Sequence, residues 1–429
     1  MKIAVIGSGG REHALIWKLQ QSPAVEKLVC MPGNPGTEKI ATNVSVSPEN
    51  HAAVIDILKQ YGIDLVVIGP EAPLVAGLAD EIRSAGIRCF GPGKEAAQIE
   101  GSKAFSKDFM KRHSIPTAEF RTFTKEQLYD AIRYLDELPM PVVIKASGLA
   151  AGKGVLICHE REEAQDVTRS MLQGDAFKEA GTTIVIEEFL DGEEVSVFAL
   201  CDGSRFVTLP PAQDHKKILD GDKGKNTGGM GAFAPAPVAD DELLAHVTKT
   251  VLVPTVEGMK REGYPFIGCL YAGLILTESG VKVLEYNCRF GDPETQVVLP
   301  LIGEDLAEIL YACAGGELSR GNIRFHEATA VCVVMASGGY PGSYKTGMKI
   351  SGLHNIKEDD GVIVFHAGTK RDGNEIVTAG GRVLGVTAIG YKDDFADTIR
   401  TAYRAVEKIT FDGAYYRSDI GRKAVDNKQ

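Results

Sequence analysis

Four short apolar runs in the first hundred residues, separated by helical patterns, constrain the fold more than any other feature of the sequence. The runs cover residues 3–6, 27–31, 65–68 and 87–90. The helical patterns between them cover residues 12–21, 50–61 and 74–85. Apolar strands that alternate with helices are typical of βαβ units, in which helices cover both faces of a parallel sheet. The pattern therefore predicts a doubly wound parallel sheet at the N-terminus.

The sequence changes character after a helical pattern at residues 103–113. Strand patterns joined by glycine-rich turns predict a mixed α+β central region, which also contains a hairpin at residues 271–287. The last hundred residues return to short strands and a closing helix, which predicts a small α/β domain. At roughly 150 residues per domain, a chain of 429 residues has room for about three domains. We expect these domains to cover residues 1–103, 104–325 and 326–429.

The expected elements of the two later domains are short. The central strand patterns cover residues 141–146, 155–158, 183–190, 195–200 and 205–209. The central helices are expected at residues 161–172 and 240–262. Near the C-terminus, strands are expected at residues 330–336, 362–367 and 382–389, and a helix at 393–409.

The charge balance argues against several classes of protein. Asp and Glu outnumber Lys and Arg by 58 to 47, which gives a net charge of −11 with histidine neutral. A protein that coats nucleic acid or an anionic membrane is therefore not expected. No apolar run reaches the roughly 18 residues that a membrane span needs. The eight cysteines are spread singly without zinc-site spacing, so we expect buried thiols in the reducing cytoplasm.

A glycine-rich segment, Gly7-Ser8-Gly9-Gly10, connects the first strand to the first helix. An NAD site is not expected, because Glu12 replaces the third glycine of a dinucleotide fingerprint and no acid ends the second strand. A glycine loop at a helix N-terminus offers N–H groups to a phosphate, although a tight turn without a ligand is the simpler interpretation. Glu71 follows the strand at 65–68, where open α/β sheets bind ligands and where a helix start favours an acid.

A second glycine-rich segment follows Lys145 and covers residues 148–154. It differs from a P-loop because it ends in Lys153-Gly154 and runs into a strand rather than a helix. A glycine loop between two strands is able to fold over a triphosphate, with the two lysines supplying positive charge. An ordinary flexible hairpin is the alternative.

Two adjacent acids, Glu187 and Glu188, interrupt the apolar strand pattern at 183–190 near its end. Adjacent carboxylates at a strand end suit the recognition of adenine and ribose, whereas a solvent-facing acid is the simpler interpretation. Glu194 begins the next strand, and a long polar loop follows at residues 214–231. Long glycine-rich loops of this kind are usually functional or disordered.

The strongest local signal lies at the end of the second hairpin strand. Side chains alternate along a strand, so Glu285, Asn287 and Arg289 are expected on one face. A carboxylate and an amide oxygen suit a hard divalent cation, and a guanidinium beside them binds an anion. The combination suits Mg²⁺ with ATP, while a solvated polar face is the alternative.

Taken in chain order, the lysine, the glycine loop, the two acids and the metal-type pair resemble those of ATP-grasp enzymes. Four longer motifs are more specific and resemble the glycinamide ribonucleotide synthetase family, and the resemblance spans essentially the whole chain. The motifs are Gly7-Ser8-Gly9-Gly10-Arg11-Glu12-His13-Ala14-Leu15, Gly69-Pro70-Glu71-Ala72-Pro73-Leu74, Asn226-Thr227-Gly228-Gly229-Met230-Gly231 and Asn287-Cys288-Arg289-Phe290-Gly291-Asp292-Pro293-Glu294-Thr295-Gln296.

The resemblance implies a fold, an activity and partners. Residues 104–325 would form an ATP-grasp fold with a mobile lid at about 120–190, and residues 1–103 would bind phosphoribosylamine. The enzyme would ligate glycine to 5-phosphoribosylamine in de novo purine biosynthesis, cleaving ATP to ADP and phosphate through a glycyl phosphate. It would use Mg²⁺ or Mn²⁺, act on small molecules only, and work as a cytoplasmic protein, with a monomer favoured. One or two metal ions both remain compatible with the sequence.

The resemblance also implies a role for individual residues. Lys145, Asp214 and Arg289 would act in catalysis, with Asp214 near the glycine amine and Arg289 neutralising the acyl phosphate. Glu285 and Asn287 would bind the metal. Gly9, Gly10, Glu71, Asp214, Arg289 and Asp292 would face phosphoribosylamine or glycine. The ATP-binding residues would be Lys103, Lys145, Gly152, Lys153, Gly154, Glu187, Glu188, Phe189, Leu190 and Glu194.

Two alternatives stay open on the sequence. One is an ATP-grasp ligase that uses a different carboxylate, and the Gly-Asp-Pro-Glu stretch after Phe290 argues against it. The other is a nucleotide-binding regulator that keeps the fold without catalysis, and the intact Lys145, Glu285, Asn287 and Arg289 argue against that.

Overall fold

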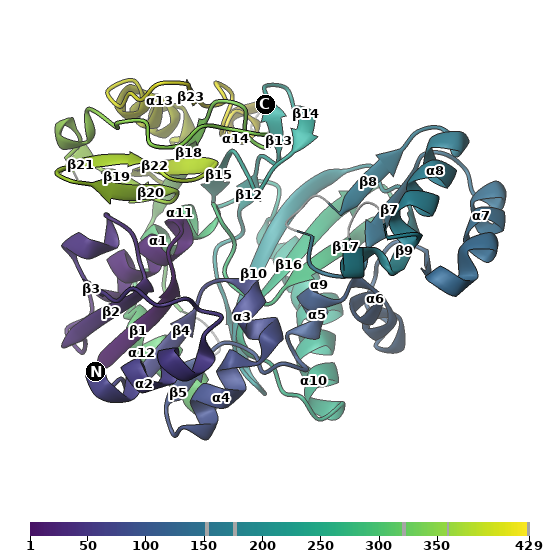
Figure 1. Cartoon of the computed structure of the whole chain (residues 1–429), viewed down its shortest axis with the longest axis horizontal. Coiled ribbons are helices and arrows are strands. Elements are labelled where there is room, and N and C mark those ends of the chain that lie inside the picture. Colours follow the sequence, from purple (N-terminus) through teal and green to yellow (C-terminus); the bar gives the residue numbers. More distant parts are fainter. Residues whose placement is uncertain (151–153, 175–177, 320–322, 358–359, 427–429) are drawn as a thin grey trace.

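The computed structural model describes residues 1–150, 154–174, 178–319, 323–357 and 360–426. Figure 1 shows the N-terminal sheet at the lower left, the C-terminal sheet above it and a smaller lobe projecting to the right. The central antiparallel sheet lies between them. Each of these four parts carries predicted site residues: Gly10 in the N-terminal part, Lys145 in the smaller lobe, Glu285 in the central sheet and Asp214 in the C-terminal sheet.

The N-terminal sheet is parallel throughout, in the order β3-β2-β1-β4-β5. Alternate residues of β1 pack on opposite faces: Ile6 belongs to the core that includes helix α2 (His51–Tyr61), and Val5 belongs to the core that includes α1 (Gly10–Leu19). This confirms the predicted doubly wound sheet. The strands are β1 (Lys2–Gly7), β2 (Lys27–Pro32), β3 (Thr42–Asn43), β4 (Leu65–Ile68) and β5 (Arg88–Phe90).

The helices of this domain are close to those expected, with one difference. The helix predicted at 74–85 is two helices, because Gly77 between them has a left-handed φ of 99° that ends the first. The helices are α1 (Gly10–Leu19), α2 (His51–Tyr61), α3 (Glu71–Ala76), α4 (Leu78–Ser84), α5 (Gln98–Gly101) and α6 (Lys103–Arg112).

The smaller lobe in Figure 1 is the predicted lid region, a four-stranded antiparallel sheet in the order β6-β9-β7-β8. Two helices pack on the sheet and form a separate hydrophobic core with it. The sequence did not predict β6 or α7, but β8 and α8 have the expected bounds. The elements are β6 (Phe120–Thr124), α7 (Leu128–Glu137), β7 (Val142–Ala146), β8 (Val155–Cys158), α8 (Arg161–Leu172) and β9 (Thr183–Glu188).

The central sheet has the antiparallel order β11-β10-β16-β17. A bulge interrupts the β16–β17 pairing, since Gly273 pairs with Glu285 and Leu274 pairs with Val283. The helix predicted at 240–262 contains a π-helical turn at Thr248–Leu252. The elements are β10 (Glu193–Asp202), β11 (Phe206–Thr208), α9 (Asp241–Val247), α10 (Val253–Arg261), β16 (Ile267–Thr277) and β17 (Gly280–Asn287).

The C-terminal sheet recruits two strands from the central part of the chain. Its order is β12-β15-β18-β22-β19, and β12 and β15 lie at the two ends of the polar loop expected at 214–231. The described loop is ordered between them as a hairpin of β13 and β14. The elements are β12 (Gln213–Asp214), β13 (Lys217–Leu219), β14 (Lys223–Asn226), β15 (Gly231–Ala234), β18 (Ala328–Ser337), β19 (Val362–His366), β22 (Arg382–Tyr391), β23 (Ala414–Tyr415) and α13 (Phe395–Val406).

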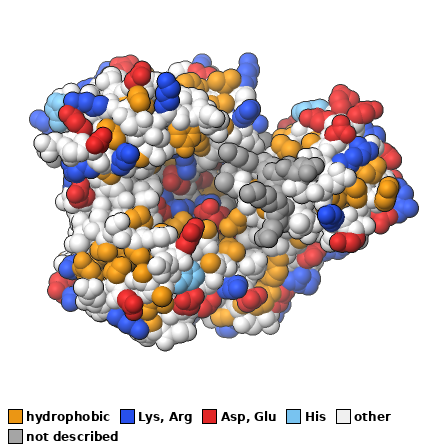
Figure 2. Space-filling model, in the orientation of Figure 1, with side chains coloured by type: hydrophobic (Ala, Val, Ile, Leu, Met, Phe, Trp, Pro, Cys, Tyr) orange, Lys and Arg blue, Asp and Glu red, His pale blue; other side chains and the backbone are white. Residues whose placement is uncertain are grey.

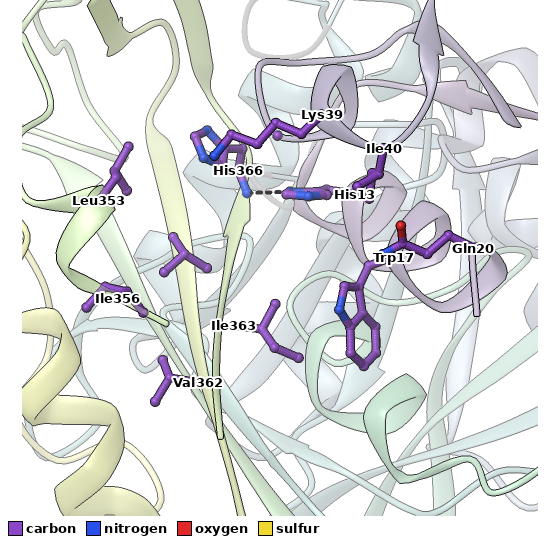
Figure 3. Close-up of a pocket in the computed structure, with 12 residues that line it drawn as sticks. His13, Trp17, Gln20, Lys39, Ile40, Leu353, Ile356, Val362, Ile363 and His366 are labelled. Carbon is purple, nitrogen blue, oxygen red and sulfur yellow. Dashed lines mark hydrogen bonds between the residues drawn. The ribbon is translucent and has the colours of Figure 1, made fainter. Parts of the chain in front are cut away.

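The N- and C-terminal domains join beside the first glycine loop. Figure 3 shows His13 of α1 next to His366 of β19, whose backbone N–H donates to His13 Nδ1 at 2.8 Å. The Asn34 amide donates to the carbonyls of Ser8 and His366, at 2.8 and 2.9 Å. The C-terminal domain therefore contacts α1 just after the Gly7–Gly10 loop, and Asn34 links that loop to His366. The remaining elements are α11 (Thr295–Val298), α12 (Leu306–Gly315), β20 (Thr369–Asp372), β21 (Glu375–Thr378) and α14 (Lys423–Asp426).

Two expectations about the chain as a whole can be compared with this fold. All eight cysteines are buried and free of disulfides, as expected. Within the described ranges, no helix is both long and apolar enough to cross a membrane.

Candidate active site

The predicted site residues meet where the N-terminal, central and C-terminal sheets approach one another. Figure 2 shows this region as a hollow near the middle of the visible face, with acidic and basic side chains inside it. The glycine loop of the N-terminal domain, the end of β17 and the loop after it all contribute to this region. Arg289 contacts residues from both of the first two predicted domains, Glu71 and Asn287.

Lys145 lies on β7, and its ammonium group contacts two partners. Its Nζ is 3.0 Å from Glu187 Oε2 and donates to the Leu284 carbonyl at 3.1 Å. Leu284 is the residue at the bulge of β17, which explains why its carbonyl is free of the strand ladder. Lys103, at the start of α6, donates to the Gly148 carbonyl at 3.4 Å. Both lysines therefore lie close to the start of the glycine flap.

Gly152 and Lys153 of that flap lie outside the described residues. Gly154 is described and buried. A Cβ at Gly154 would lie 2.6 Å from the Ala150 Cβ, so a larger residue at position 154 would collide with Ala150.

The two acids of β9 have different environments. Glu187 is 2% exposed and pairs with Lys107 and Lys145. Glu188 points to the other face, where its Oε1 accepts from Lys282 Nζ at 2.8 Å. Alternation along a strand accounts for this difference. Glu187 therefore faces the lysines of the site, and Glu188 does not.

The segment after β9 leads from the lid to the central sheet. Phe189 and Leu190 follow the last residue of β9, and the Phe189 side chain is exposed. Glu194 on β10 pairs with Lys216 at 2.6 Å. An exposed aromatic ring and a strand end leave backbone and apolar surface accessible at the point expected for adenine.

Glu285 and Asn287 lie on β17 beyond its bulge, where the pairing is regular, so alternation puts these two on one face. β17 ends at Asn287, so Arg289 lies outside the strand and the predicted alternation does not extend to it. Burial alone would raise the pKa of Glu285, but three nearby lysines, Lys216, Lys145 and Lys103, hold that pKa below its ordinary value. Asn287 Oδ1 accepts from Arg289 Nη2 at 3.1 Å. An ionised carboxylate beside an amide oxygen fits a hard divalent cation.

The described residues supply few other metal ligands. They contain no group of three or more His, Cys, Asp or Glu side chains able to hold a metal. A divalent ion at Glu285 and Asn287 would therefore take most of its ligands from phosphate and water oxygens, as Mg²⁺ does beside nucleotides.

Arg289 is buried in a network of carboxylates. Its Nη2 is 3.0 Å from Glu100 Oε1, and its Nε is 3.5 Å from Glu71 Oε2. Burial opposes the charged guanidinium, but Glu100 and Glu71 raise the pKa of Arg289 above its ordinary range. Glu100 was not predicted from the sequence, because it reaches this site from α5 through the fold alone.

Glu12 explains the shape of the first glycine loop. Its Oε2 accepts from the Gly9 N–H at 2.5 Å, and its Oε1 accepts from Arg11 Nε at 2.6 Å. A Cβ at Gly69 would lie 2.0 Å from Glu12 Oε1, so a larger residue there cannot coexist with this side chain. Glu12, whose position argued against an NAD fingerprint, therefore fills the space between two loops. The Gly9 N–H is already used by Glu12.

Asp292 connects the site to the C-terminal domain. Its Oδ1 accepts from Gln296 Nε2 at 2.8 Å and lies 3.4 Å from Arg382 Nη1. The same Arg382 nitrogen donates to the backbone carbonyls of Asp292 and Gly228, both at 2.6 Å. Arg382 therefore joins the polar loop to the loop after β17. No pattern in the sequence around Arg382 indicates this role, so Arg382 was not predicted as a site residue.

Asp214 has an unusual protonation equilibrium. Burial raises the pKa of Asp214 to about 7; Lys216 opposes the rise, and Glu294 and Glu194 add to it. The neighbouring Tyr271 hydroxyl donates to Glu294 at 2.5 Å. Asp214 should therefore take up a proton at a higher pH than an ordinary aspartate does.

The raised pKa of Asp214 offers a test of the role that the sequence resemblance implies for it, at the glycine amine. If Asp214 holds the glycine ammonium, KM for glycine should rise roughly tenfold per pH unit below about pH 7, because the protonated acid no longer attracts the cation. Steady-state kinetics between about pH 6 and about pH 8 test this, with KM for ATP as the internal control. A KM for glycine that is flat over that interval would remove Asp214 from the glycine site.

Comparison with known proteins agrees with this arrangement. Models of the phosphoribosylglycinamide synthetase family match in order: the N domain at residues 1–100, the ATP-grasp (A) domain at 101–295 and the C domain at 330–423. The chain belongs to the phosphoribosylglycinamide synthetase family. The ATP-grasp resemblance inferred from the sequence is thus confirmed.

Individual relatives align with nearly the whole of this chain. A phosphoribosylamine–glycine ligase of Rhodopirellula baltica is 50% identical over 430 residues, covering 99% of this chain and 98% of the relative. The trifunctional purine biosynthetic protein adenosine-3 of Gallus gallus is 50% identical over 428 residues, and the chain spans only 42% of its length. The solved structure of phosphoribosylamine–glycine ligase from Thermotoga maritima has a TM-score of 0.84 at 35% identity, with coverage of 98% of this chain and 100% of that one.

Proposed function

We propose that this protein ligates glycine to 5-phosphoribosylamine, forming glycinamide ribonucleotide while ATP is cleaved to ADP and phosphate. The observation that supports this most directly is the match of all three family domains in order, at about the full length of a single-function relative. The cluster of Lys145, Glu285 and Arg289 in one hollow supports the same chemistry, because it offers cations for phosphate beside an ionised carboxylate.

The proposed reaction has two steps. A glycine carboxylate oxygen attacks the γ-phosphorus of ATP, the bond to the bridging oxygen breaks, and ADP leaves. The amine of phosphoribosylamine then attacks the carbonyl carbon of glycyl phosphate, expels phosphate and loses a proton. Phosphorylation is needed because a free carboxylate has no adequate leaving group. The protein contributes mainly positioning and charge neutralisation.

We assign the steps to residues as follows. Lys103, Lys145 and the flap of residues 148–154 hold the ATP phosphates, and the segment from Glu187 to Leu190 borders adenine. Glu194 lies at the ribose. Arg289 neutralises the developing acyl phosphate, and Asp214 receives the glycine amine. Gly9, Gly10, Glu71 and Asp292 face the phosphoribosylamine.

We propose that Mg²⁺ or Mn²⁺ is held by Glu285 and Asn287. The ion would neutralise phosphate charge at this position. Asn287 would turn its amide oxygen from Arg289 to the ion, which releases one hydrogen bond of Arg289 Nη2 for an anionic substrate. We further propose a lid at about residues 120–190 that closes over ATP, and a protein that works as a cytoplasmic monomer.

The amino-acid specificity tests the assignment. Glycine should be the preferred substrate, and kcat/KM for alanine should be lower by about a hundredfold or more, because a site shaped for a substrate without Cβ excludes the methyl group sterically. ADP release is measured with glycine, alanine and serine, with and without freshly generated phosphoribosylamine. Equal turnover of the three amino acids would refute the assignment.

A further inference from the structure

Lys107 and Lys145 share a single carboxylate oxygen. Both ammonium groups lie 3.0 Å from Glu187 Oε2, although they come from different elements, α6 and β7. The side chains of the two lysines are 3% and 7% exposed, and that of Glu187 is 2% exposed. Two buried cations and one buried anion thus form a triad with a net charge of +1.

The two lysines differ in what else they contact. Lys145 donates to the carbonyl of Leu284, the residue directly before Glu285, so it borders the metal-type pair. Lys107 donates to Thr117 Oγ1 at 2.7 Å, and that hydroxyl donates in turn to the Val283 carbonyl at 2.7 Å. Among the described residues, the polar contacts of Lys107 are therefore with the protein groups of Glu187 and Thr117. Burial lowers the pKa of Lys107 to about 8, which agrees with its enclosed position.

Among the described residues, the ion pairs of Glu187 are those with Lys107 and Lys145. Its second oxygen, Oε1, is buried without a hydrogen-bond partner in the described structure. When a buried carboxylate has only one cationic partner, the two groups pair and their charges cancel, because an unpaired buried charge is costly. Without Lys107, Glu187 would therefore pair with Lys145 alone. The remaining pair would lack the net positive charge that attracts a phosphate group.

We propose that Lys107 is a positioning residue for ATP binding: it shares Glu187 with Lys145 and so leaves the Lys145 charge available to the ATP phosphates. This inference rests on the proposed contact between Lys145 and ATP. It assigns no contact with the nucleotide to Lys107 itself. The effect of Lys107 on ATP binding acts entirely through Glu187, so a substitution of Glu187 should abolish that effect.

A double-mutant cycle on full-length protein tests the proposal. MgATP affinity is measured by calorimetry without the other substrates, for wild type, Lys107→Met, Glu187→Gln and the double variant. Lys107→Met should weaken MgATP binding about ten- to a hundredfold, as expected for losing a charge-assisted contact. In the Glu187→Gln background, the same change should alter affinity by less than about threefold, because Lys145 keeps its charge without the carboxylate.

Two further variants define the controls. Lys107→Arg keeps the charge and should restore most of the affinity lost in Lys107→Met. Lys18→Met removes another buried lysine, one that donates to the Ile302 carbonyl at 2.6 Å, and should leave MgATP affinity unchanged. Lys18→Met therefore separates a specific effect from the general cost of losing a buried charge.

The outcomes are distinguishable. A folded Lys107→Met protein that binds MgATP within about threefold of wild type would overturn the proposal, as would an equal loss in both backgrounds. If Lys107→Met does not fold, the comparison of Glu187→Gln with the double variant is the test. A loss of MgATP affinity above about tenfold between those two variants overturns the proposal. Unchanged affinity in Lys145→Met would instead contradict the ATP role of Lys145, which belongs to the proposed function.

Discussion

Glu285→Ala is expected to fold normally and to lose turnover by a factor on the order of 10² to 10³, the usual cost of removing one preorganised electrostatic element. Glu285 is half-buried in a polar region, and it contributes charge rather than apolar contact. The stability change should therefore be about 1 kcal/mol or less. Glu285→Gln keeps the shape and loses the charge, so it should be milder in stability and nearly as severe in turnover.

The test of this prediction combines thermal melting with ADP release at several Mg²⁺ concentrations. Excess Mg²⁺ should restore part of the turnover if Glu285 acts by binding the ion. A stable Glu285→Ala protein with turnover within about threefold of wild type would exclude Glu285 from the active site.

Arg289→Ala should behave differently, because it should cost both turnover and stability. Removing the guanidinium leaves Glu100 buried without its cation, and breaking a buried pair from one side costs about 3–5 kcal/mol. Burial already raises the pKa of Glu100, and loss of Arg289 should raise it further. The destabilisation should therefore grow as pH rises above the ordinary carboxyl range and shrink in mild acid, where Glu100 takes up a proton.

A second substitution separates the two effects of Arg289. Arg289→Ala with Glu100→Gln should recover much of the lost stability, because Glu100, the more buried of the two carboxylates that Arg289 pairs with, no longer carries a charge, yet it should remain inactive. Melting curves at two pH values and ADP release for both variants test this. Recovery of turnover together with stability would assign Arg289 a structural role only.

Local patterns predicted most of the fold. The bounds of β8 and α8 were predicted correctly, because β-branched strands and helical spacing are short-range signals. The break at Gly77 was missed, because the left-handed conformation of one glycine depends on its packing as well as on its type. The sequence also did not predict that β12 and β15 join the C-terminal sheet, because pairing between strands far apart in sequence produces no periodic pattern.

The same distinction applies to the site. Glu285 and Asn287 were predicted to share a face from alternation, and the structure keeps them together on β17. Glu100 bonds the Cys288 backbone N–H across 188 residues of sequence, and no local pattern indicates such a contact. Lys107 and Arg382 were missed for the same reason. Glu12 could be read only as a departure from a fingerprint until the structure showed it between Gly7, Gly9 and Gly69.

The central claim is that the glycine carboxylate is activated as an acyl phosphate, and oxygen transfer tests it most directly. Glycine labelled with oxygen-18 in both carboxylate positions is incubated with the enzyme, MgATP and freshly generated phosphoribosylamine, and the released phosphate is analysed by mass spectrometry. If glycyl phosphate forms, each phosphate carries a single heavy oxygen, because the C–O bond breaks when the amine displaces phosphate. Phosphate released with no heavy oxygen, in step with product formation, would contradict the account.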